Sequence, residues 1–329
     1  MASPLRFSAN INTFNACADR YVLSGYGQRA TVEEMIQAAT RVPGLTGVEV
    51  VGLWHVNDDN VAEVYRRVRD AGLCVTCVTP DIWAQAKWGK GSFTSSDPAI
   101  RDAAVREVQK SMEWARQMDC DIVDLWFGQD GYDYPLQSDY IAAWDRIVDC
   151  TAACADHLPE VRLVIEYKQK EPRTHCHVST VGNTLQLLRE VDRPNVGAMI
   201  DVGHTLMAYE NAAESAALLQ RAGKKLYYMH FNDNWRLWDD DMMAGSIHTI
   251  ELIELLYWLD RTGYDGWYAL DIFPYREDGV RAAEESIRWI EALHGLLDTM
   301  GRDRIGEVIA AGDATQASAM VREALFGRG

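Results

Sequence analysis

The sequence predicts a (β/α)8 TIM barrel, and two patterns along the chain carry this prediction. Short apolar runs rich in Val, Ile and aromatic residues alternate with amphipathic helical segments from one end of the chain to the other. Several runs are apolar at successive positions, which is typical of parallel strands covered on both faces. Eight such strand–helix units in series indicate the barrel. A doubly wound open sheet is the structural alternative.

Eight strands are expected between Leu5 and Phe273. Their ranges are Leu5–Ile11, Gly47–Val51, Leu73–Thr79, Ile122–Phe127, Leu163–Tyr167, Gly197–Val202, Leu226–Phe231 and Trp267–Phe273. No phosphate-binding fingerprint of the G-x-G-x-x-G or Walker type follows the first of them.

Helical segments separate the strands, and several have recognisable ends. The segment TVEEMIQAATRV begins with a capping box from Thr31 to Glu34. Pro98 falls in the first turn of SDPAIRDAAVREVQKSMEWARQM. Several other segments end in Gly shortly before the next strand, as helix C-caps do.

We expect one barrel domain over residues 1–299 and a short helical extension over residues 300–329. The barrel pattern ends after about Thr299, and IGEVIAAGDATQASAMVREALF predicts one or two amphipathic helices. These helices are expected to pack on the barrel or on another subunit, which leaves a homo-oligomer open.

Composition and charge limit the class of partner. The formal net charge is −17, from 49 acidic and 32 basic residues. Nucleic acids and anionic membranes are bound through Lys and Arg, so neither is an expected partner. No apolar run is long enough to span a bilayer, and no secretory signal is visible. The seven cysteines lie mostly within apparent strands and helices, and we interpret most of them as core residues of a cytoplasmic protein.

Charged and imidazole side chains interrupt or follow four consecutive strands in the second half of the chain. In chain order they are Glu166 and Lys168, Asp201 and His204, His230, and Asp271. Residues at the carboxyl ends of barrel strands face the active site. A buried carboxylate without a partner is costly, and several together require cations.

Divalent metal is the simplest source of that positive charge. Carboxylates and imidazoles without thiolates suit Mg²⁺, Mn²⁺ or Co²⁺ better than a structural zinc. One ion would take Glu166, Asp201, His230 and Asp271. A second ion, sharing Glu166, would account for His204 and the run Asp239–Asp241. Paired ions about 4 Å apart are a known catalytic arrangement.

This ordered set resembles the metal-dependent aldose–ketose isomerases of the xylose isomerase-like barrel superfamily, and most closely the L-rhamnose isomerase type. The matching pieces are Glu166-x-Lys168, Asp201-x-x-His204, His230, Asp239-x-Asp241 and Asp271. The resemblance covers roughly the first 300 residues. Each piece alone is weakly specific, whereas the ordered set on consecutive strands is specific.

The resemblance implies two divalent metal ions and a monosaccharide substrate. A structural ion would be held by Glu166, Asp201, His230 and Asp271. A catalytic ion would be held by Glu166, His204, Asp239 and Asp241. Lys168 would hydrogen-bond the reacting end of the sugar, and His55 looks like the histidine that such enzymes place near the ring oxygen. Asp240 would point to solvent.

The implied reaction moves a hydrogen between C2 and C1 of an open-chain sugar and a proton between O1 and O2. Two cations can bind both oxygens and stabilise negative charge on them, and a lysine adds polarisation. Aromatic walls would shield the carbon centre from water. We expect these walls to be Trp54, Trp83, Trp126 and Phe127, with ordinary core packing as the alternative for each.

Three other functions are left open. A ketose 3-epimerase of the same superfamily uses one metal and two glutamates that exchange protons at C3. An apurinic-site endonuclease shares the barrel, but would need three zinc ions, more histidines and a basic groove. A non-catalytic sugar-binding barrel would bind sugar without metal. The sequence names neither the sugar nor the metal, and it does not decide between a hydride shift and an enediol route.

Overall fold

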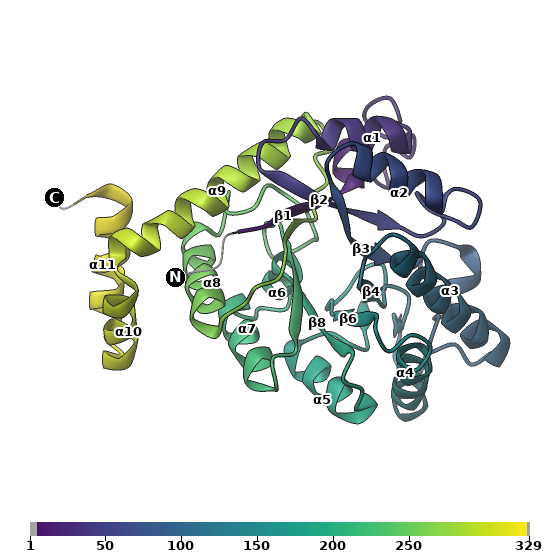
Figure 1. Ribbon diagram of the computed structural model, residues 1–329. Helices are drawn as coiled ribbons and strands as arrows, with labels where there is room; N and C mark the ends of the chain where they lie inside the picture. Colours follow the sequence, from purple (N-terminus) through teal and green to yellow (C-terminus); the bar gives the residue numbers. More distant parts are fainter. Residues whose placement is uncertain (1–4, 328–329) are drawn as a thin grey trace.

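The computed structural model describes residues 5–327, and it confirms the predicted barrel (Figure 1). The barrel strands are all parallel and close in the order β1-β10-β9-β8-β6-β4-β3-β2. Their bounds are β1 Phe7–Asn10, β2 Leu45–Val51, β3 Cys74–Thr79, β4 Ile122–Trp126, β6 Arg162–Glu166, β8 Val196–Asp201, β9 Leu226–Phe231 and β10 Tyr268–Leu270.

The predicted strands are all present, but β10 is shorter than its apolar run suggests. It pairs with β1 and β9 through three residues only, whereas the run continues to Phe273. Ile272 lies beyond the last paired residue and is still buried. An apolar run therefore indicates buried residues and not strand pairing alone. The residues directly after β10 stay buried beneath loops, although they no longer pair with a neighbouring strand.

Helices surround the barrel on its outer face (Figure 1). Their bounds are α1 Val32–Ala39, α2 Val61–Asp70, α3 Pro98–Gln117, α4 Tyr140–Ala155, α5 Val181–Val191, α7 Ala212–Arg221, α8 Thr249–Thr262 and α9 Gly279–Met300. Shorter turns of helix follow three of the strands: η1 Ile11–Phe14, η2 Ala86–Trp88 and α6 Val202–Met207.

A small two-stranded sheet outside the barrel was not predicted. Strand β5, Gly131–Tyr132, pairs antiparallel with β7, His175–Cys176. Each strand has two residues, which is too short for a periodic pattern in the sequence. This sheet joins the loop after β4 to the loop after β6.

Two apolar clusters form the core. The larger one lies between the strands and the surrounding helices, and the smaller one fills the barrel interior. Six of the seven cysteines are buried and all seven are free thiols, as expected for core residues.

Two further helices, α10 Arg302–Ala311 and α11 Ala314–Phe326, follow α9 and lie at its far end, away from the barrel strands (Figure 1). They confirm the predicted C-terminal helices, whereas the division into two domains stays a prediction. Residues 1–4 and 328–329, at the outer ends of those two predicted segments, lie outside the described residues. Among residues 5–327, no helix combines the length and apolar character that crossing a membrane requires.

The capping box of α1 gives a test of local helix stability. Thr31 Oγ1 accepts the Glu34 N–H at 3.2 Å, and Glu34 Oε2 accepts the Thr31 N–H at 2.8 Å. Thr31→Ala removes the hydroxyl acceptor, so we expect denaturant unfolding to show a loss of roughly 1 kcal/mol in the free energy of unfolding. Thr31→Ser keeps the hydroxyl and should stay close to wild type. Equal losses in both variants would contradict this role of the hydroxyl.

Candidate functional site

The site is one layer of polar side chains inside the barrel. The apolar layer beneath it consists of Cys77, Ile122, Val164, Met199, Tyr228 and Ala269. Two positions further along these strands the inward-facing residues are Thr79, Asp124, Glu166, Asp201, His230 and Asp271. Side chains alternate along a strand, so both sets face the interior. The apolar layer, called the floor below, therefore lies directly beneath a ring that consists of Thr79, four acids and one histidine.

Four predicted metal ligands come together on this floor. Glu166, Asp201, His230 and Asp271 offer ligand atoms that all lie within 4.8 Å of one another. His230 Nδ1 is 3.0 Å from Glu166 Oε1, and 3.9 Å from both Asp201 Oδ2 and Asp271 Oδ2. Strand register explains part of this proximity, because Asp201 and His230 are direct partners across β8 and β9.

A second group is composed differently from the predicted set. Asp201, His204 and Asp239 offer atoms within 4.8 Å of one another. His204 Nε2 lies 3.0 Å from Asp239 Oδ2 and 3.9 Å from Asp201 Oδ1. Asp201 caps α6 by accepting the His204 N–H at 2.8 Å, which holds the two residues together. The carboxylate common to both groups is therefore Asp201, where Glu166 was expected.

Asp241 lines the same cavity but belongs to neither group within residues 5–327. Its Oδ1 accepts a long hydrogen bond of 3.4 Å from Asn232 Nδ2, and its carbonyl accepts the Phe273 N–H at 3.0 Å. Its φ of +46° lies in the left-handed region, which non-glycine residues seldom adopt. The backbone of Asp241 is thus tied to the segment after β10.

Lys168 already neutralises part of the second group. Its Nζ lies 2.6 Å from Asp239 Oδ2 and 3.6 Å from Glu171 Oε2, and it sits 5.2 Å from the centre of the Trp126 ring. Burial opposes its charge, but the neighbouring Asp239 and Asp241 raise the Lys168 pKa above its usual value. The ammonium therefore stays charged, with Asp239 as its main partner.

The loop that carries the three aspartates is closed at its base. Asp233 and Met242 exchange two backbone hydrogen bonds, of 3.0 and 2.9 Å. The buried Asp233 carboxylate also accepts from the ring Nδ1 of His248 at 2.7 Å and from its backbone N–H at 2.9 Å. These contacts fix the two ends of the loop, so Asp239 and Asp241 sit on a short tethered segment.

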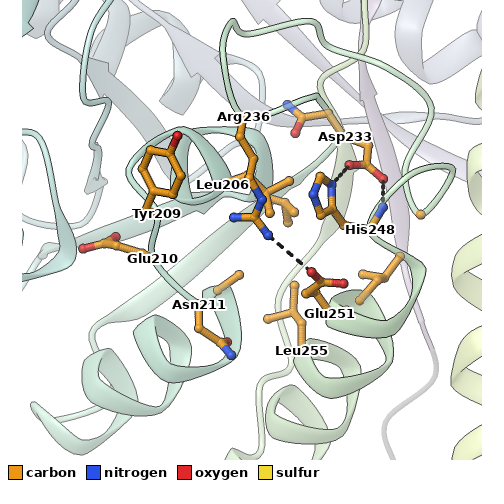
Figure 2. A pocket seen from close by; sticks show the side chains of 14 residues that line it. Leu206, Tyr209, Glu210, Asn211, Asp233, Arg236, His248, Glu251 and Leu255 are labelled. Carbon is orange, nitrogen blue, oxygen red and sulfur yellow. Dashed lines mark hydrogen bonds and ion pairs between the residues drawn. The ribbon is translucent and has the colours of Figure 1, made fainter. Parts of the chain in front are cut away.

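Figure 2 shows the Asp233–His248 pair beside a separate hollow of about 290 Å³. Arg236 points into this hollow and lies 3.3 Å from Glu251. None of the residues of the two ligand groups lines it. His248 therefore has a structural role in anchoring the loop.

The ligand groups open into a cavity of about 270 Å³, just below the range of roughly 300–1,000 Å³ for small-molecule sites. Trp54, Trp83 and Trp126 line it, and their binding of substrate stays a prediction. Their ring centres are 5.9 Å apart between Trp54 and Trp83, and 4.9 Å apart between Trp83 and Trp126. The three indoles form one continuous wall.

Phe127 is not part of that wall. It follows Trp126 directly, and successive side chains of an extended segment point to opposite sides. Phe127 is buried against Phe93, with ring centres 5.5 Å apart, and does not line the cavity. The assignment of Phe127 to the substrate wall is corrected accordingly.

His55 also lies outside the cavity, contrary to expectation. Its Nδ1 accepts the Val51 N–H at 2.9 Å, and its Nε2 is 3.1 Å from Asn12 Oδ1. Burial lowers the His55 pKa to about 4, so the ring is neutral and its one proton must be on Nε2, facing Asn12. Asn12 lines the cavity, and His55 supports it from behind.

Two buried acids of the site were missed. Glu49 on β2 accepts hydrogen bonds from His230 Nε2 at 3.0 Å and from the Tyr228 hydroxyl at 2.9 Å. Asp124 on β4 lines the cavity, and its Oδ1 has no hydrogen-bond partner. Each is a single acid within an apolar run, GVEVV or IVDLW, which is the same signal that identified Glu166.

Burial and mutual repulsion shift the titration of these acids. Burial raises the pKa of Asp201 to about 6 and that of Asp271 to about 7. Burial, together with the nearby Glu166, raises the pKa of Asp124 well above its usual range. The two histidines and Lys168 supply too little positive charge for all the carboxylates to ionise near neutral pH.

Residues 36–293 match the model of a protein family described as xylose isomerase-like TIM barrel. The chain is 27% identical to the xylose isomerase of Thermus thermophilus over 234 residues, which cover 68% of this chain. The match spans 60% of that enzyme's own length.

Solved structures share the fold at lower identity. The chain is similar to L-ribulose 3-epimerase with a TM-score of 0.70 and 14% identity, covering 93% of this chain and 98% of the epimerase. It is similar to D-allulose 3-epimerase from Methylomonas sp. with a TM-score of 0.66 and 16% identity, covering 89% and 100%. Because the family match spans most of the barrel, this chain belongs to the xylose isomerase-like TIM barrel family.

Proposed function

We propose that the protein is a divalent-metal-dependent sugar isomerase that interconverts an aldose and a ketose. The observation that carries this proposal is the adjacency of two histidine–carboxylate groups, which share Asp201 and face one small cavity. Family membership supports an enzyme that acts on sugars, because the curated relative is a xylose isomerase. The substrate class is an open-chain monosaccharide.

The residues present fit two divalent ions. The donors are carboxylate oxygens and imidazole nitrogens, which suit Mn²⁺, Mg²⁺ or Co²⁺. Asp239 Oδ1 is buried without a hydrogen-bond partner, and such orphaned acceptors call for a cation. The first set is Glu166, Asp201, His230 and Asp271; the second is His204, Asp239 and Asp241, with Asp201 or Glu166 shared. When bound, the ions would neutralise these acids and polarise the oxygens on C1 and C2.

The remaining side chains supply positioning and shielding. Lys168 is charged and lies on the cavity wall, so it can donate a hydrogen bond to the reacting carbonyl oxygen. The wall of Trp54, Trp83 and Trp126 excludes water from one side of the sugar and packs on its C–H groups. Asp124 Oδ1, buried and unpaired beside the cavity, is free to pair with a sugar hydroxyl.

A ketose 3-epimerase with a single ion is the second candidate, and one observation favours it. Asp239 already has the Lys168 ammonium at 2.6 Å, whereas no acid of the first group forms an ion pair with a lysine among residues 5–327. Two glutamates facing the substrate would be expected of such an epimerase, and Glu166 is the one glutamate among the described residues that line the cavity. The acid after β10 is Asp271, which favours the isomerase.

The activity is tested on a panel of sugars. Purified chain loaded with Mn²⁺ should interconvert an aldose–ketose pair among pentoses, hexoses, deoxyhexoses, tetroses and branched sugars, detected by NMR. Failure across the panel would contradict the isomerase. Loss of a ketose C3 hydrogen to solvent D₂O, with one ion bound per chain, would establish the epimerase instead.

Asp241 and Asp240 form a matched pair for testing the second ion. Asp241→Ala should remove one of two bound ions and lower kcat by roughly 10²-fold or more, because a charge stabiliser is lost. Asp240 lies next to it, but its Oδ2 accepts the Trp235 N–H outside the ligand groups, so Asp240→Ala should keep both ions. Glu166→Gln should lower kcat more than either Asp241→Ala or Asp240→Ala does. Metal analysis showing two ions in Asp241→Ala, or full activity, would refute the two-ion assignment.

The raised carboxyl pKa values predict how the stability of the metal-free chain depends on pH. Burial raises Asp201 and Asp271 to pKa values of about 6 and 7, above the unfolded value near 3.9. The folded chain therefore binds more protons than the unfolded chain, and stability falls as the pH rises from about 4 to 7. Burial opposes charge on His204, but Asp201 and Asp239 raise its pKa to about 9, so its contribution is also lost as the pH rises through 9.

A divalent ion replaces those protons. We expect Mg²⁺ to raise the Tm more at pH 8 than at pH 5, measured by calorimetry. Asp271→Asn removes one titrating acid and should flatten the decline in stability of the metal-free chain between pH 4 and 7. A Tm increase that is independent of pH would be inconsistent with this electrostatic account.

A further inference from the structure

The two histidines of the ligand groups face their acids with different ring nitrogens. His204 Nδ1 lies 3.1 Å from the Tyr167 carbonyl oxygen, which can only accept, so this nitrogen carries the proton. His204 Nε2 then faces Asp239 at 3.0 Å. His230 is reversed: its Nε2 faces Glu49 at 3.0 Å, and its Nδ1 faces Glu166 at 3.0 Å.

The partner that orients His230 is itself held from below. Glu49 is 1% exposed on β2 and does not line the cavity. The Tyr228 hydroxyl donates to Glu49 Oε1 at 2.9 Å, and it lies 2.7 Å from Thr76 Oγ1. Thr76 Oγ1 in turn lies 2.6 Å from Ser8 Oγ. These contacts connect strands β1, β3, β9 and β2 across the barrel interior.

Tyr228 is the donor to Glu49 in this series. The Thr76 hydroxyl has a single proton and two acceptors within reach, the Tyr228 oxygen at 2.7 Å and the Val48 carbonyl oxygen at 3.2 Å. The second oxygen of Glu49 is left for the Nε2–H of His230. Both Glu49 oxygens are thus committed, so Glu49 is a partner of the histidine and not a further ligand.

We infer that Glu49 is a positioning residue of the candidate metal centre, fixing His230 in the tautomer that presents Nδ1 to the first ion. This inference rests on the proposed function, because it requires an ion at the first group. Metal-binding histidines commonly donate their other N–H to a carboxylate, which sets the ring orientation and strengthens the ligand nitrogen. His204 receives the same support from a main-chain carbonyl, so of the two histidines it is His230 that is oriented by a replaceable side chain.

Glu49→Gln gives the direct test. The amide has nearly the same shape but lacks the charge, so calorimetric titration with Mn²⁺ should show 10- to 100-fold weaker binding at one site. The other site should change much less. Ser8→Ala is the matched control, because it breaks the far end of the same buried series without touching Glu49. It should lower stability while leaving both affinities near wild type.

The tautomer of His230 is tested by a separate measurement. With Zn²⁺, which has no unpaired electrons, ¹⁵N spectra of labelled histidines should show His230 protonated at Nε2 and bound through Nδ1 in the wild type. In Glu49→Gln that single state should be lost or weakened. If Glu49→Gln does not fold, Tyr228→Phe removes only the donor to Glu49 and should give a smaller loss of affinity in the same direction.

Three results would overturn the role of Glu49: wild-type affinity in Glu49→Gln, an equal loss in Ser8→Ala, or binding of the ion through His230 Nε2. Each of them leaves wild-type metal binding intact. A wild-type chain that binds no divalent ion would instead refute the proposed function, and the role of Glu49 with it.

Discussion

Crowding of acids at one level of the barrel interior is the constraint on which the rest of the site depends. Closing eight strands brings every inward side chain of a layer within reach of the others. Here that layer holds acids from β2, β4, β6 and β8, and from the end of β10. Their repulsion is offset by contacts that the fold builds around them. His230 lies between Glu49 and Glu166, and Lys168 lies 2.6 Å from Asp239. Burial and the nearby Glu166 raise the pKa of Asp124 well above its usual range.

The two ligand groups differ in how firmly the fold holds them. Every member of the first group is on a strand or directly after one, so its position follows from strand register. The second group depends on the loop after β9. This loop lies close to the start of α6, where residue 203 must be a glycine to leave room for it. A Cβ at Gly203 would lie 2.7 Å from Asn232 Oδ1 and 2.8 Å from Asn234 Nδ2. The Gly203 N–H instead donates to Asn232 at 2.7 Å, so the missing side chain brings the loop to the start of α6.

The sequence was sufficient to predict the barrel and most of the acids, because both follow from local patterns. Alternating runs predict the strands, and an acid within or after an apolar run predicts a ligand. Glu49 and Asp124 show this same signal, a single acid within an apolar run, so both could have been predicted from the sequence. Phe127 could have been excluded from the wall by alternation alone, once Trp126 was assigned to it. His55 could not, because Asn12, a residue 43 positions earlier, separates it from the cavity.

Competition for Asp239 bears on the choice between the two candidate functions, because only the isomerase is proposed to use a second ion. In the metal-free chain a single oxygen of Asp239, Oδ2, contacts both His204 at 3.0 Å and Lys168 at 2.6 Å. An ion at this group must displace the His204 proton, whose pKa is about 9, and must tolerate the ammonium of Lys168 nearby. Glu171 lies 3.6 Å from Lys168 Nζ and offers that ammonium a second partner. Among residues 5–327 no lysine forms an ion pair with an acid of the first group. Burial opposes charge on His230, but Glu49 and Glu166 raise its pKa well above the usual value, so an ion there must also displace a proton. Under the proposed two-ion scheme, an ion at the second group therefore competes with Lys168 for Asp239, and an ion at the first group meets no such lysine within the described part of the chain.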